Sequence, residues 1–247
     1  MQVPAYTAIA IAEIALFVYV LRIWRRGRAV KAGESIVLLV ILCGVIYDNL
    51  MLAFGGSVLG EGAALEMLSY PRYLLHGLFT PLLIIFCALS ADRMNVPGYR
   101  KRETLTLWGA VTFFAIWFGL IGDLVNLTIE PAVQDGLLSY KHSGELGPPI
   151  AEVATVISML IIGGAMQRYA RWPWIFVSAS IMFVIALFFI DNGVIANLGE
   201  LVLLSGGAAT AAEAVKRVTA ERADKKAAAL REAAERRAAK SVSDVSA

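Results

Sequence analysis

The chain has 247 residues, of which 58% are hydrophobic and 17% charged, and its mean hydropathy of +0.68 is too high for an ordinary soluble domain. The formal net charge is only +2, and the basic residues form short clusters beside apolar segments. That distribution argues against a nucleic-acid-binding surface and predicts an integral membrane protein.

Cysteine and histidine usage narrows the possible chemistry. Both cysteines, Cys43 and Cys87, fall inside apolar runs, which argues against a disulfide framework or a cysteine-based metal site. The two histidines, His76 and His142, are too few for a histidine-rich iron or zinc centre. We therefore expect neither a metal nor a cofactor.

Seven apolar runs are long enough to cross a membrane. The first extends from about Ala5 to Trp24 and is followed at once by a basic cluster in residues 25–31. Because Lys and Arg accumulate on the cytoplasmic side, this order predicts a first helix with its N-terminus outside. The six further runs are residues 35–58, 69–91, 104–126, 148–168, 173–191 and 193–213.

The connecting loops alternate in charge. Residues 25–31, 93–102 and 168–171 carry basic side chains, whereas the loops at 60–68 and 128–147 are poor in them. We therefore predict an all-α polytopic protein of the cell membrane, in the manner of a bacterial inner-membrane protein, with its N-terminus out and its C-terminus in. Residues 1–213 form the seven-helix transmembrane domain. Residues 214–247 form a charged, helical cytoplasmic tail that is disordered from Ser241 onward.

A polar stripe marks the start of the third run. Arg72, His76 and Thr80 recur every four residues, so they share one face of a helix, with Tyr73 beside them. Ionisable groups at membrane depth are costly unless they find a protein partner or a water-filled cavity. We therefore expect a functional site along this stripe.

The other helices carry ionisable residues at a similar depth. A rise of about 1.5 Å per residue places Glu13 about 12 Å, Asp48 about 15 Å, Arg72 about 5 Å and His76 about 10 Å below the outer surface. Further acids in the outer halves are Asp123, Glu152, Asp191 and Glu200. A common depth across the helices predicts one acidic cavity open to the outer face.

Such a cavity is suited to acid–base chemistry, since its six acids face one arginine and one histidine. Asp48 could orient and charge the imidazole of His76, while Arg72 could receive an anionic group or hold Asp48 ionised. The predicted catalytic residues are Asp48, His76 and Glu200. The predicted substrate-binding residues are Arg72, Glu13, Tyr47, Asn49, Tyr73, Trp117, Glu152 and Asp191.

Three classes of function fit this pattern. The first is an enzyme that acts on a lipidic or isoprenoid substrate, for example by protonation-initiated cyclisation or by hydrolysis. The second is a small proton- or cation-coupled transporter. The third is a sensor or receptor, but without retinal, since residues 193–212 contain no lysine for a Schiff base. The expected partners are membrane lipids and a small lipophilic substrate, with no nucleic acid.

Overall fold

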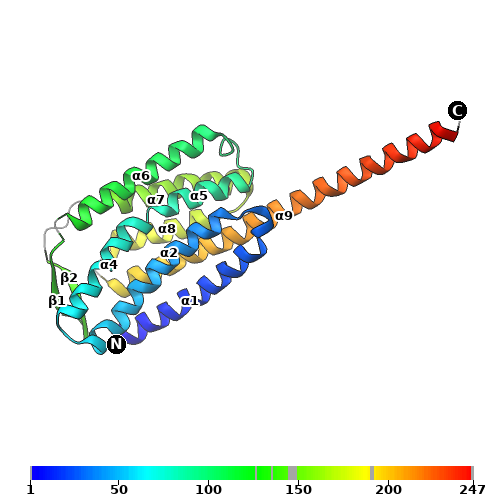
Figure 1. Cartoon of the computed structure of the whole chain (residues 1–247). Helices are drawn as coiled ribbons and strands as arrows, with labels where there is room; N and C mark the ends of the chain where they lie inside the picture. The colour runs from blue at the N-terminus through cyan, green and yellow to red at the C-terminus, as the bar shows by residue number, and fades with distance from the viewer. Residues whose placement is uncertain (1, 126, 135, 144–148, 190–191, 246–247) are drawn as a thin grey trace.

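In the computed structural model, which describes residues 2–125, 127–134, 136–143, 149–189 and 192–245, long helices lie side by side in one bundle (Figure 1). The α-helices are α1 (Gln2–Arg26), α2 (Gly33–Leu50), α3 (Gly56–Leu59), α4 (Ala63–Phe79), α5 (Leu82–Arg93), α6 (Arg102–Leu124), α7 (Ile150–Ala165), α8 (Trp174–Phe188) and α9 (Gly193–Val245). Shorter turns are η1 (Arg28–Val30), which is a 3-10 turn, and the π-helical η2 (Met51–Gly55) and η3 (Met166–Ala170).

Six helices of the described chain are long and apolar enough to cross a membrane. They are Val3–Arg26, Gly33–Leu59, Ala63–Arg93, Arg102–Ile121, Ile150–Ala170 and Gly193–Arg236. The expected sixth run corresponds to α8, which is apolar but has 15 residues and is therefore only about 22 Å long. Large apolar side chains on α6, including Phe113, Phe114 and Phe118, are exposed, as expected of a surface that faces lipid.

The described chain is all-helical, as the sequence predicts, apart from one short hairpin. The predicted outer loop at 128–147 contains two antiparallel strands, β1 (Ile129–Gln134) and β2 (Leu137–His142). Ile129 and Tyr140, on one face of the hairpin, are buried in a cluster with Leu65 of α4, whereas Leu137, on the other face, is buried in a cluster with Tyr6 of α1. Pairing the strands satisfies their backbone groups, which explains why this stretch is not an irregular loop.

The two ends of the bundle differ in character. The hairpin and the N-terminus lie at one end, and α9 leaves the bundle at the other (Figure 1). α9 is a single helix of 53 residues, and its residues 222–236 are exposed. It continues past Ser241, where the sequence predicts disorder, to Val245.

A buried acid at the α9-exit end ties three segments together. Glu34, in the first turn of α2, is 1% exposed and pairs with Arg93 at 3.3 Å between Oε2 and Nε. Arg93 also donates to the carbonyls of Val30, at 2.7 Å, and Lys31. The sequence analysis uses Arg93 only as one of the loop charges that predict topology. In the structure Arg93 also joins the end of α5 to the connection between α1 and α2.

Close packing of α7 on α8 depends on a glycine. A Cβ at Gly163 would lie 2.7 Å from the backbone nitrogen of Phe176 and 2.9 Å from Cγ2 of Ile175. At the neighbouring Gly164, the nearest atoms are on the ring of Phe176, at 3.8 Å or more. Only the first position therefore requires the absence of a side chain.

We predict that Gly163→Ala lowers the stability of the bundle by about 1–3 kcal/mol, because the backbones of α7 and α8 must separate. Gly164→Ala is the matched control, and its effect stays within about 1 kcal/mol, because alanine favours a helix and meets no close contact there. Thermal unfolding of the two variants in the same detergent measures the difference. Equal melting temperatures would contradict the packing described for Gly163.

Candidate functional site

The polar stripe of the third run lies on α4, just before a break in the helix. α4 ends at Phe79 and α5 begins at Leu82, because Pro81 has no N–H to continue the hydrogen-bond ladder. Together the two helices make one apolar segment, Ala63–Arg93, of 31 residues. Arg72 and His76 therefore lie in the half of this segment nearer the hairpin, and Thr80 lies at the break.

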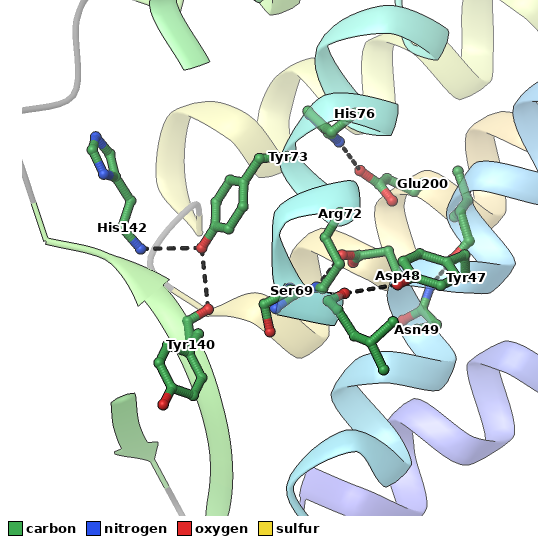
Figure 2. Close-up of polar contacts among 12 residues, drawn as sticks. Tyr47, Asp48, Asn49, Ser69, Arg72, Tyr73, His76, Tyr140, His142 and Glu200 are labelled. Carbon is green, nitrogen blue, oxygen red and sulfur yellow. Dashed lines mark hydrogen bonds and ion pairs between the residues drawn. The ribbon is translucent and has the colours of Figure 1, made fainter. Parts of the chain in front are cut away.

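Arg72 is paired with Asp48 of α2. The Nε–Oδ1 distance is 2.6 Å, and the two side chains are 13% and 28% exposed (Figure 2). The guanidinium also lies over the ring of Tyr73, 5.8 Å from its centroid. A partly buried charge pair of this kind is stronger than one in water and needs both partners.

The neighbours of Asp48 point in different directions, because consecutive helix residues are about 100° apart around the axis. The hydroxyl of Tyr47 donates to the carbonyl of Leu68 on α4, at 2.7 Å. Asn49 faces α1, where its amide donates to both carboxylate oxygens of Glu13, at 2.9 and 3.1 Å. Glu13 and Asn49 are both fully buried, so this pair joins α1 to α2 behind Asp48.

His76 lies between two carboxylates from different helices. Its Nδ1 is 3.9 Å from Oε1 of Glu200 on α9, and its Nε2 is 4.0 Å from Oε1 of Glu152 on α7 (Figure 2 shows the contact with Glu200). The sequence analysis predicts Asp48 as the partner of His76. In the structure Asp48 pairs with Arg72, and the carboxylates of Glu152 and Glu200 flank the imidazole.

These side chains surround a cavity of about 230 Å³. Its lining residues are Asp48, Arg72, Tyr73, His76, Glu152, Asn197 and Glu200. A narrower space of about 20 Å³ adjoins it and reaches Thr80, with apolar walls that include Ile41, Val45, Leu75 and Phe79. The cavity is therefore polar, and its narrow extension is mostly apolar.

Tyr73 connects the cavity to the hairpin. Its hydroxyl accepts a hydrogen bond from the backbone N–H of His142, at 3.0 Å, and donates to the carbonyl of Tyr140, at 3.2 Å (Figure 2). The hairpin packs closely elsewhere too, since a Cβ at Gly56 would lie 2.2 Å from the carbonyl oxygen of Leu138. Sequence reasoning missed this role of the hairpin, because it took the segment for a surface loop.

Six of the predicted site residues meet at the cavity, and the others that the structure describes do not line it. Tyr47, Asn49 and Glu13 hold helices together beside it. Trp117 is 54% exposed on the apolar outer face of α6 and does not line the cavity. Asp191 and the side chain of Asp123 lie outside the described residues. Asn197, which is not among the predicted site residues, also lines the cavity; it lies one turn before Glu200 on the same face of α9.

The described part of the chain contains no group of three or more His, Cys, Asp or Glu side chains arranged to hold a metal ion. Comparison of the sequence with known protein families and with curated proteins finds no match. The geometry of the cavity is therefore the basis for any statement about function.

We predict that Asp48→Asn and Arg72→Gln each lower the stability by about 2 kcal/mol, because each leaves a partly buried charge without its partner. In the double variant the loss is smaller than the sum by about 1–2 kcal/mol, since the two side chains interact directly. Denaturant unfolding of all four proteins measures this coupling energy.

The exposed ion pair of Glu232 and Arg236 on α9 is the control for this double-mutant cycle. Its coupling energy, measured with Glu232→Gln and Arg236→Gln, is no more than about 0.5 kcal/mol. A coupling at Asp48 and Arg72 as small as this would mean that water screens the pair inside the cavity.

Proposed function

We propose that the protein is an integral membrane enzyme that performs acid–base chemistry on the polar head of a lipidic or isoprenoid substrate. The observation that carries the proposal is the position of His76, within 4.0 Å of carboxylates from two other helices at the wall of a polar cavity. An imidazole between carboxylates is suited to accepting and returning a proton near neutral pH.

In this scheme His76 removes a proton from a substrate hydroxyl or from a water molecule and later returns it to the leaving oxygen. Glu200 and Glu152 stabilise the imidazolium that forms between these two steps. Arg72 is held in place by Asp48, and its remaining N–H groups are available to a negative charge that develops on the substrate.

The size of the cavity favours chemistry at the head of the substrate. A volume of about 230 Å³ is below the range of about 300–1,000 Å³ typical of sites that enclose a whole drug-sized ligand. The chain of an isoprenoid therefore lies outside the cavity, among the helices or in the bilayer. Hydrolysis or proton transfer at the head is accordingly favoured over cyclisation of an enclosed chain.

The proposal includes a membrane topology of seven spans, with the N-terminus outside and the C-terminus inside. α8 is short, but it runs antiparallel to α9, since Gly206 packs on Trp174 and Gly199 packs on Ile185. This antiparallel packing supports α8 as the seventh span. Together with the charge alternation of the loops, it supports a cavity that opens to the outer face.

A carrier function is the alternative, and the break at Thr80–Pro81 favours it. Discontinuous helices in membrane proteins often place ion or substrate sites at the interruption. Here the break borders the narrow extension of the cavity, which Thr80 lines. A proton- or cation-coupled transporter would use the same carboxylates to bind the coupling ion.

We predict that His76→Gln and Glu200→Gln each slow turnover at least about 100-fold, because each removes part of the proton-transfer group. The protein is reconstituted in liposomes with a total lipid extract of its native membrane, and mass spectrometry follows the consumption and formation of lipid species. Glu103→Gln, which removes an exposed carboxylate at the start of α6, is the matched control with unchanged turnover.

The same liposomes separate the two candidate functions. Chemical change of a lipid that depends on His76 supports the enzyme. Solute or proton flux that depends on His76, without chemical change, supports the carrier. Full activity of both variants in both assays would show that the cavity is not the functional site.

A further inference from the structure

A second polar hollow lies at the opposite end of the bundle, where α9 leaves it. This inner groove has a volume of about 290 Å³ and lies between α9 and the segment from the end of α5 towards α6. Its lining residues are Asp92, Arg93, Asn95, Arg100, Val218, Glu221, Arg222 and Lys225. It contributes nothing to the acid–base chemistry proposed for the cavity near the hairpin.

The groove carries an excess of positive charge. Four of its side chains are cationic, namely Arg93, Arg100, Arg222 and Lys225, and two are carboxylates. One of these carboxylates, Glu221, is already paired with Lys225 at 2.6 Å. With Glu34, which pairs with Arg93 from outside the lining, four cations face three carboxylates, and the remaining positive charge would attract an anion.

The basic side chains are held in position by contacts within the protein. Arg93 is fixed by Glu34 and by two backbone carbonyls, and Arg222 donates to the carbonyl of Ala29. Arg100 donates to Oδ1 of Asn95 at 3.2 Å. Groups that are oriented in advance lose little entropy when a ligand arrives.

Aromatic residues lie at the same end of the bundle as the groove, and Trp24 packs in the same apolar cluster as Val218 of the groove. Trp24 is covered by Arg28, and Tyr169 by Arg168, with 4.6 and 5.5 Å between each guanidinium carbon and the ring centroid. Tyr169 and Trp174 are more than half exposed. Aromatic residues with neighbouring cations are typical of the level of the lipid head groups.

We propose that the inner groove binds the phosphate head group of an anionic phospholipid from the leaflet at this end of the bundle. Basic pockets between transmembrane helices on the cytoplasmic side are known to bind such head groups. Val218 gives the groove an apolar wall for the glycerol and the first part of the acyl chains. A bound head group would join α9 to the end of α5 and so brace the helix at its exit from the bundle.

The test is native mass spectrometry of the full-length protein in micelles with phosphatidylglycerol or phosphatidylcholine. We expect the wild type to retain phosphatidylglycerol in preference to phosphatidylcholine. Arg100→Gln and Lys225→Gln should each weaken retention about five-fold, which corresponds to about 1 kcal/mol for one lost cation. Arg100→Lys keeps the charge and should restore most of the retention.

Lys226→Gln is the matched control, because Lys226 follows Lys225 on α9 but does not line the groove. It should change retention less than two-fold. Melting temperatures without added lipid show that each variant is folded. Equal retention of the two lipids would overturn the proposal, and so would an equal loss in Lys226→Gln. Displacement of phosphatidylglycerol by millimolar inorganic phosphate would show that the groove takes a free anion instead of a lipid.

Discussion

A charged side chain inside a membrane must be paired, and the contact between Arg72 and Asp48 meets this constraint for the whole site. The pair joins α2 to α4, and it fixes the face of α4 that is turned towards the interior of the bundle. His76, one turn further along α4, is thereby directed towards α7 and α9, where Glu152 and Glu200 meet it. Rotation of α4 by one residue would separate all of these contacts at once.

The positions of the helices along the chain could be predicted from hydropathy, because a lipid-facing helix needs a long apolar run whatever its neighbours are. Depth along each helix follows from the constant rise per residue, and the four residues that it places in the outer half, Asp48, Arg72, His76 and Glu200, line one cavity in the structure.

The rotation of each helix about its own axis, and the pairing of side chains between helices, could not be predicted in the same way. Tyr47, Asp48 and Asn49 have similar depths, but only Asp48 lines the cavity, because the packing of α2 against α1 and α4 decides which face points inward. Trp117 has a suitable depth and still faces outward. Hydropathy also gave no sign that residues 129–142 pair as strands, since their short alternation is a weak signal beside that of a membrane helix.

The length of α9 has a mechanical consequence. Glu200 at the cavity and Glu221 at the inner groove belong to one uninterrupted helix, and a separation of 21 residues corresponds to about 32 Å along its axis. A helix resists compression and twisting far more than the loops around it do. Any turn of α9 that moves Glu200 relative to His76 must therefore turn the groove and the projecting tail by a similar angle. The cavity near the hairpin and the inner groove at the opposite end of the bundle are thus coupled mechanically through one helix.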